Sequence, residues 1–135
     1  YYRGDPLVSH ILSSLYLSKN DIPQTIIALK QFLEVFGPDS EINSTIANLY
    51  FLENDLENAL VYANYAIRID PNEDNAYWAL ARVFVRKNEF TDVILALEVL
   101  RSYFGYTFTR QNFYEDELFA SIAEEPIFKD WLNTL

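Results

Sequence analysis

The chain repeats one short phrase three times at a fixed interval of 34 residues. The phrase is an asparagine, an acidic residue and an apolar residue, and it occurs as "NDI" at 20–22, "NDL" at 54–56 and "NEF" at 88–90. Other columns recur at the same interval, among them Leu12/Ile46/Leu80, Ser13/Ala47/Ala81 and Tyr16/Tyr50/Phe84. A period of this length is typical of stacked repeats, because one such unit is too small to bury its own apolar face. The sequence therefore predicts three successive units.

Each unit is predicted to be a pair of helices joined by the repeated phrase. In the middle unit, Ile42, Ile46 and Leu49 fall on one face of a first helix. Asn54 is expected to end that helix, because asparagine tolerates the left-handed backbone conformation that a helix exit requires. Asp55 is expected to begin the second helix, because its carboxylate caps free N–H groups at the positive end of the helix dipole. An apolar series then runs to Pro71: Leu56, Ala59, Leu60, Ala63 and Ile67.

The recurring small residues Ala47 and Ala81 predict where helices approach one another closely. A small side chain leaves room for a neighbouring helix, and the ring of Tyr50 or Phe84 one turn later fills the adjoining space. We therefore expect Ala47 to lie at a close helix contact.

These residues resemble the tetratricopeptide repeat family, and the middle unit is the most similar. Its matching positions are Ile46, Ala47, Tyr50, Ala59, Ala66 and Pro71. The outer units depart from the family pattern at Thr25 and Val93, where alanine is expected, and at Gly37 and Gly105, where proline is expected. The resemblance implies an all-α fold, a right-handed superhelical stack of helical hairpins.

The period and the resemblance together predict the organisation of the chain. An unstructured start at 1–5 is followed by repeats at 6–39, 40–73 and 74–107, and then by C-terminal capping helices at 108–135, all in one domain. The chain begins with tyrosine and contains no methionine, so we expect it to be a fragment of a longer protein.

The segment after the repeats is predicted to hold two short amphipathic helices. "SYFGYTFT" at 102–109 is expected to be a linker, and "FYEDELFASIA" at 113–123 is expected to be one helix. Pro126 suits the first turn of a last helix, whose apolar residues are Phe128, Trp131, Leu132 and Leu135. Such helices would cover the open face of the last hairpin.

Charge and composition exclude several classes of protein. Twenty acidic against ten basic residues give a net charge of −10, which repels the phosphates of nucleic acids and of anionic membranes. No apolar run is long enough to span a bilayer, so no membrane insertion is expected. The absence of cysteine excludes disulfides but leaves the compartment open, with the cytoplasm favoured and the periplasm as the alternative.

The sequence offers little for catalysis, and no enzyme activity, cofactor or metal site is predicted. The single histidine, His10, has no serine or cysteine nucleophile context, and we expect it to be solvated or to line a groove. Consecutive residues of a helix point in different directions, so Glu115, Asp116 and Glu117 are expected to form a solvated helix start rather than a metal or acid–base site. The tripeptide Arg3-Gly4-Asp5 is expected to be a chance match to an adhesion motif.

The resemblance implies that the first helices of the hairpins line a concave groove that binds a peptide. The residues carried over to that groove are His10, Ser14, Leu17, Ser44, Asn48, Phe51, Asn75, Trp78, Arg82 and Arg86. Spacing alone places Trp78, Arg82 and Arg86 one turn apart on a single helical stripe. Two arginines beside an indole suit a peptide carboxylate with an apolar neighbour. The alternative is that both arginines pair with local acids such as Glu53, while Trp78 packs inward.

One known variety of the family grips the acidic tails of chaperones with a carboxylate clamp. His10 and Ser14 replace the lysine and asparagine of the clamp's first unit, and Asn75 and Ala79 replace its later lysine and arginine. That specific activity is therefore not expected here.

The preferred function is a non-enzymatic protein–protein interaction module, an adaptor or scaffold that binds a peptide or a partner helix. Two alternatives remain at this point: a small acidic chaperone of the secretion type that shields a client protein, and a regulatory tail of a larger enzyme. The partner and the oligomeric state are left open.

Overall fold

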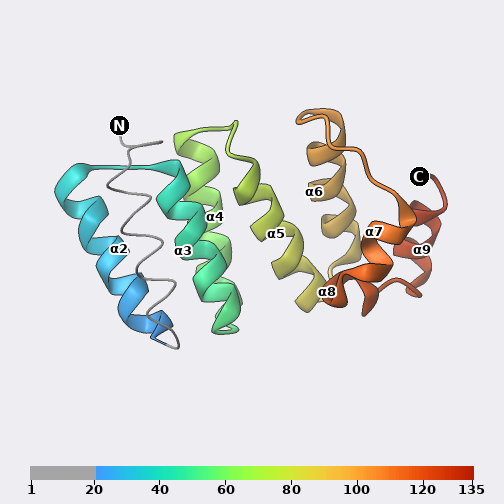
Figure 1. The fold of residues 1–135 in the computed structure, drawn as a ribbon, viewed down its shortest axis with the longest axis horizontal. Coiled ribbons are helices and arrows are strands. Elements are labelled where there is room, and N and C mark those ends of the chain that lie inside the picture. The colour runs from blue at the N-terminus through green and yellow to red at the C-terminus, as the bar shows by residue number, and fades with distance from the viewer. Residues whose placement is uncertain (1–20) are drawn as a thin grey trace. The chain divides into compact units, whose positions relative to one another are not determined.

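The computed structural model describes residues 21–135, which fall into two compact units, with described parts 21–76 and 77–135. Several predictions lie outside the described residues: the unstructured start, the first helix of the first repeat, the adhesion tripeptide, and the groove residues His10, Ser14 and Leu17. Every regular element between residues 21 and 135 is a helix, so the all-α stack of helical hairpins is confirmed for this part (Figure 1).

The described part of the first unit contains α2 (Ile22–Phe36), α3 (Ser40–Leu52) and α4 (Leu56–Ile69), and α5 (Asp74–Arg86) begins in it. Helices α3 and α4 form a closely packed hairpin, and α2 packs against α3. The core of this unit is made of Ile26, Leu29, Ile42, Ile46 and Leu49. Helix α4 also buries a row of small side chains, Ala59, Ala63 and Ala66, and this row lets its neighbours approach closely.

The repeated phrase forms the turn inside each described hairpin, as predicted. Asn54 and Asn88 have φ values of 60° and 57°, the left-handed conformation expected of both. After Asn54, the N–H of Asp55 donates to the carbonyl of Tyr50 at 2.9 Å, and the corresponding bond recurs after Asn88. These bonds satisfy carbonyls that a helix end otherwise leaves unpaired.

Capping by the acidic residue of the phrase is confirmed at two of its three positions. The side chains of Asp21 and Asp55 accept hydrogen bonds from backbone N–H groups at the start of α2 and α4. Glu89 makes no such bond at the start of α6 (Phe90–Ser102). Glutamate is one methylene longer than aspartate, so its carboxylate is less suited to reach back to the N–H groups of the first turn.

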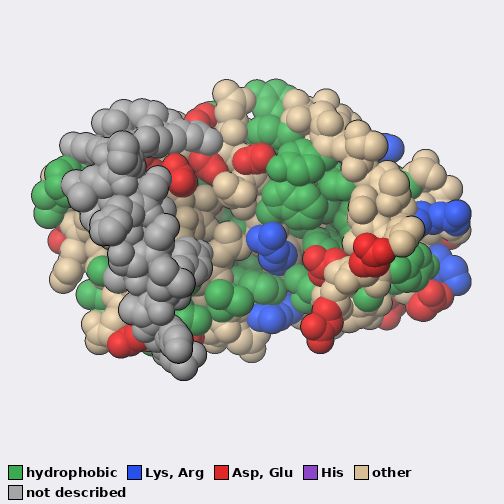
Figure 2. Space-filling model, viewed as in Figure 1, with side chains coloured by type: hydrophobic (Ala, Val, Ile, Leu, Met, Phe, Trp, Pro, Cys, Tyr) green, Lys and Arg blue, Asp and Glu red, His purple; other side chains and the backbone are tan. Residues whose placement is uncertain are grey.

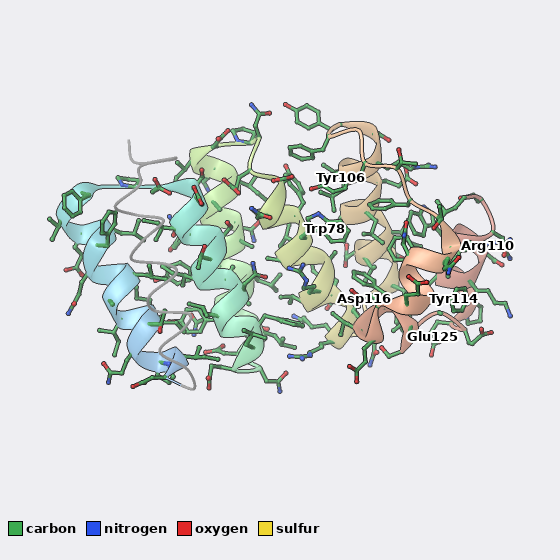
Figure 3. The ribbon with its side chains drawn as sticks, in the orientation of Figure 1. Trp78, Tyr106, Arg110, Tyr114, Asp116 and Glu125 are labelled. Atoms are coloured by element: carbon green, nitrogen blue, oxygen red, sulfur yellow. The ribbon has the colours of Figure 1, made fainter. Side chains whose placement is uncertain are left out.

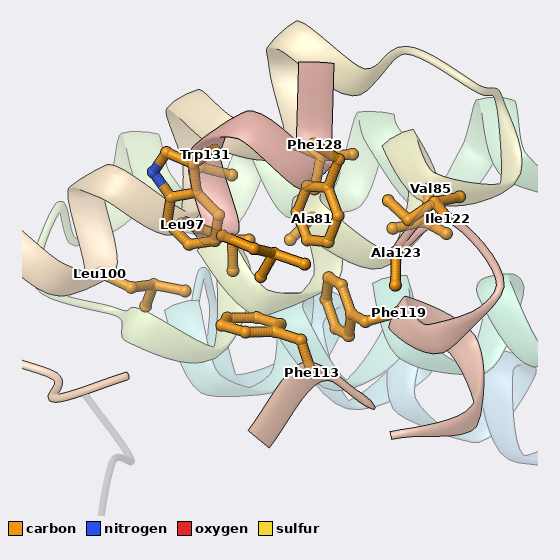
Figure 4. Packing of buried hydrophobic residues seen from close by; sticks show 13 residues of the cluster. Ala81, Val85, Leu97, Leu100, Phe113, Phe119, Ile122, Ala123, Phe128 and Trp131 are labelled. Carbon is orange, nitrogen blue, oxygen red and sulfur yellow. The ribbon is translucent and has the colours of Figure 1, made fainter. Parts of the chain in front are cut away.

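The second unit contains α5 from Tyr77 onward, α6, α7 (Arg110–Glu115), α8 (Glu117–Ala120) and α9 (Pro126–Leu132). Its core joins buried residues of α5 and α6 to aromatic residues of the C-terminal segment, as Figure 4 shows. The buried aromatic residues are Phe113, Phe119, Phe128 and Trp131. Pro126 opens α9, as predicted, and 103–109 is an irregular linker.

The prediction of one helix over 113–123 is wrong, because the helix breaks at Asp116. This residue has an extended backbone (φ −84°, ψ 118°), and its carboxylate accepts hydrogen bonds from the N–H groups of Leu118 (3.0 Å) and Phe119 (3.3 Å). On one continuous helix Phe113 and Phe119 would point about 120° apart. The break at Asp116 allows both rings to enter the same core.

None of the helices within residues 21–135 is both long and apolar enough to cross a bilayer.

A polar contact fastens α9 to α6 beside the core of the second unit. The indole N–H of Trp131 donates to Oε1 of Glu98 at 2.7 Å, and Arg101 donates to both oxygens of the same carboxylate at 2.7 and 2.9 Å. Partial burial raises the pKa of Glu98, but the hydrogen bonds from Trp131 and Arg101 and the arginine charge outweigh it, so the pKa of Glu98 lies below its ordinary value of 4.5.

This carboxylate gives a testable pH dependence. Because the pKa of Glu98 is lowered in the folded state, its contribution to stability is present above pH 4.5 and is lost as the pH falls through the lowered pKa. We expect Glu98→Gln to lower the melting temperature at neutral pH, and we expect its difference from wild type to shrink below about pH 4. Thermal melts by circular dichroism between neutral pH and about pH 3 would measure this. Glu125→Gln is the control, because Glu125 is exposed and makes no side-chain capping bond. A difference in melting temperature between Glu98→Gln and wild type that stays constant from neutral pH to about pH 3 would contradict the prediction.

Candidate functional site

The arginine–tryptophan stripe predicted from spacing is present on α5. Trp78, Arg82 and Arg86 occupy successive turns of this helix. The guanidinium carbon of Arg82 lies 5.9 Å from the ring centroid of Trp78, a cation–π distance. Arg82 is half-buried and Arg86 is exposed in the last turn, where a positive charge suits the negative end of the helix dipole. One face of α5 therefore presents an indole and two cationic groups in line.

The indole of Trp78 packs against the C-terminal segment of the same unit. Its ring centroid lies 5.6 Å from that of Tyr106, 5.8 Å from that of Phe108 and 6.3 Å from that of Phe119, with all three pairs edge to face. This geometry is favourable for aromatic pairs. Trp78 thus packs inward, as the alternative interpretation held, yet it remains only half-buried.

A pocket of about 260 Å³ opens beside this ring. We call it the Trp78 pocket, and its lining residues are Trp78, Tyr106, Thr107, Phe108, Asn112, Phe113, Asp116 and Phe119. Figure 3 shows Trp78 on α5 facing Tyr106 of the linker, with Asp116 between α7 and α8. Hydrophobic side chains reach the molecular surface in this region, as the space-filling view in Figure 2 shows.

Two polar side chains of the Trp78 pocket, Asn112 and Asp116, are held in place by helix caps. Asn112 accepts a hydrogen bond from the N–H of Thr109 at 2.9 Å, in a capping box that begins α7. One oxygen of Asp116 caps α8. Residues fixed in this way give the pocket a formed shape before a ligand arrives, and a formed site lowers the entropy cost of binding.

The chemistry of this site suits binding rather than catalysis. Its walls are mostly aromatic, and flat apolar surfaces of this kind accept an aromatic or aliphatic side chain of a ligand. The side chains of Glu115, Asp116 and Glu117 are exposed, as predicted, but only Asp116 and Glu117 belong to a helix start, because Glu115 is the last residue of α7. Within residues 21–135 no cluster of histidine, cysteine or acidic side chains is arranged to hold a metal ion.

The other predicted groove residues lie in the first unit or outside the described residues. Asn48 is half-buried on α3 and Phe51 is buried near the end of that helix. Ser44 is buried, and its hydroxyl donates to the carbonyl of Glu41 at 3.0 Å. Asn75 is exposed, and its side chain donates to Glu73 at 3.3 Å. Their membership of one groove with Trp78 stays a prediction.

Most residues of the Trp78 pocket were not predicted from the sequence. Tyr106 and Phe108 lie in the irregular linker, and Phe113 and Phe119 lie on the two short helices that follow. The available signal was the aromatic content of "SYFGYTFT" at 102–109, since a solvated linker has no need of four aromatic residues.

Comparison with known protein families gives a match over most of the chain. The model of the family described as ChAPs (Chs5p-Arf1p-binding proteins) matches residues 2–114, which is most of the chain. Neither a curated protein nor a solved structure matches.

Proposed function

The chain belongs to the ChAPs family, and from that premise we propose that it is a non-enzymatic interaction module that acts as an adaptor in a larger protein assembly. The family description names two protein ligands, Chs5p and Arf1p. We take a protein partner of this kind as the ligand of this chain. The hairpins are taken to be tetratricopeptide-like repeats with the boundaries given above, because the turn chemistry and the small-residue columns are those that such repeats need.

The Trp78 pocket and the two arginines of α5 are the proposed binding site. An apolar side chain of the partner enters the aromatic pocket, and a carboxylate close to it in the partner sequence meets Arg82 or Arg86. The observation that carries this proposal is the guanidinium of Arg82 placed 5.9 Å from the centroid of the pocket's own tryptophan ring. Aromatic and arginine side chains of this kind dominate the energetics of protein interfaces, and a guanidinium can hold a carboxylate with two parallel hydrogen bonds.

The charge of the chain supports a protein ligand over a nucleic acid. A net charge of −10 repels a phosphate backbone, whereas the stripe on α5 offers a local cationic site within an acidic molecule. No feature of the described residues specifically favours the two alternatives, a small chaperone of the secretion type and a regulatory tail of a larger enzyme.

We expect Arg82→Glu to weaken partner binding by about tenfold or more, because the change replaces an attraction to the partner carboxylate with a repulsion. The measurement uses an array of overlapping peptides that covers Chs5p and Arf1p, probed with the wild-type chain and with the variant.

Arg110→Glu is the matched control, since Arg110 is exposed on α7 of the same unit and does not line the Trp78 pocket. It should bind as the wild type does. Unchanged binding of Arg82→Glu to every positive peptide, with a circular dichroism melt like that of the wild type, would refute the proposed site.

A further inference from the structure

The first unit carries an apolar groove that is separate from the Trp78 pocket. The groove has a volume of about 470 Å³ and lies between α2 and α4. Leu33 of α2 lines one side, and Tyr62, Tyr65 and Ile69 of α4 line the other. We call it the α2–α4 groove. All of its lining residues belong to the first unit, so its geometry does not depend on the second.

The helices that form the α2–α4 groove expose apolar side chains, of which Tyr65 and Ile69 line the groove. On α4, Val61, Tyr65 and Ile69 follow one another at intervals of one turn and are 41%, 42% and 37% exposed. At the end of α2, Val35 and Phe36 are also exposed. A continuous stripe of this kind differs from the scattered exposed apolar residues of ordinary surfaces, and it marks a place where another apolar surface packs.

The charge around the α2–α4 groove selects the kind of partner. Residues 21–76 contain ten acidic and only two basic side chains, a formal charge of −8. Both basic groups already lie against aromatic rings of their own unit: Lys30 donates to the hydroxyl of Tyr50, and the guanidinium carbon of Arg68 lies 5.6 Å from the centroid of Tyr65. The groove wall itself carries one acidic and one basic side chain, Glu34 and Arg68, both exposed, so the negative charge near the groove comes from the unit as a whole. A ligand surface that is both apolar and basic is complementary to an apolar groove in this negatively charged unit.

We propose that the α2–α4 groove binds one face of a basic amphipathic helix from a protein partner, at a site independent of the Trp78 pocket. Apolar side chains spaced by three and four residues on that helix fill the groove between Leu33 and the stripe on α4, the usual manner in which a helix enters a groove. Lysine and arginine side chains at the flanks of the helix face Glu34 and the acidic surface of the unit. An adaptor with this second site holds two protein ligands at once.

The test uses the whole chain and two synthetic helices labelled with fluorescein. Each helix has about 14 residues, roughly four turns, with leucines on one face. Lysines occupy the other face in the first peptide and glutamates in the second. Fluorescence anisotropy gives the affinity of each peptide for the wild type, and we expect the lysine peptide to bind at least about tenfold more tightly, with an affinity that falls as salt rises.

Three variants locate the binding. The double variant Tyr65→Ser/Ile69→Ser should weaken binding of the lysine peptide by about tenfold or more, because it removes the apolar stripe. Glu34→Lys should weaken the lysine peptide several-fold and strengthen the glutamate peptide. Leu95→Ser is the control, since Leu95 is a 59% exposed apolar residue of the second unit, and it should change nothing.

Four results would overturn the proposal: no binding of the lysine peptide, equal binding of both peptides, undiminished binding by a folded Tyr65→Ser/Ile69→Ser variant, or lost binding by Leu95→Ser.

A further arm tests vesicles of phosphatidylcholine with phosphatidylserine. Attachment of the chain to these vesicles that the double variant abolishes would assign the stripe to lipid instead. Arg82→Glu should leave the peptide affinities unchanged, so failure here is distinguishable from failure of the proposed function.

Discussion

Phe128→Ala should lower the free energy of unfolding of the second unit by about 3–5 kcal/mol, the range found when a large buried aromatic side chain is cut back to alanine. The Phe128 side chain is fully buried. Its ring centroid lies 5.9 Å from that of Phe113, 6.5 Å from that of Phe119 and 5.6 Å from that of Trp131. Removing it leaves a cavity where α9 meets the two preceding short helices, and rings fixed by several neighbours cannot all move in to fill it.

The chain provides its own probe for this experiment. Both tryptophans, Trp78 and Trp131, lie in the second unit, so tryptophan fluorescence during urea unfolding reports on that unit. Ile127→Ala is the control at the neighbouring position, because Ile127 is 53% exposed, and it should change the stability by less than about 0.5 kcal/mol. Equal midpoints for Phe128→Ala and wild type would show that the C-terminal helices do not contribute to the core.

The local features of the hairpins were predictable because their causes lie within a few residues. Asn54 and Asn88 adopt the left-handed conformation, and Asp55 caps a helix, in each case through the chemistry of one side chain and its adjacent backbone. The order of Trp78, Arg82 and Arg86 along α5 follows from helix periodicity alone. Predictions of this kind need no knowledge of distant parts of the chain.

The C-terminal segment was predicted less well, because tertiary packing decides its shape. Its apolar pattern over 113–123 fits one helix, but two rings on different faces must enter one core, and the chain breaks at Asp116 to allow it. The Trp78 pocket was missed for a related reason, since one wall comes from a linker whose path no local rule fixes. Residue patterns gave the tetratricopeptide resemblance, whereas membership of the ChAPs family came only from comparison.

Fully buried small side chains mark close packing in the hairpin of α3 and α4. Ala47 of α3 is fully buried, and so are Ala59, Ala63 and Ala66 of α4, the helix with which α3 forms its hairpin. Full burial of so small a side chain leaves no free volume for a larger one at the same position. Ala47→Leu should therefore destabilise the first unit by roughly 1–3 kcal/mol, because three additional carbon atoms force the helices apart or drive side chains out of their preferred rotamers.

Thermal unfolding followed by far-ultraviolet circular dichroism is the suitable measurement for Ala47→Leu, because both tryptophans lie outside the first unit. Asn64→Leu provides the matched control: it introduces the same side chain at an exposed position of α4, and it should leave the melting temperature nearly unchanged. If Ala47→Leu melted at the wild-type temperature, Ala47 would not lie at a close helix contact. The recurring small column Ser13/Ala47/Ala81 would then need a cause other than helix approach, since tight packing is what restricts such positions to small side chains.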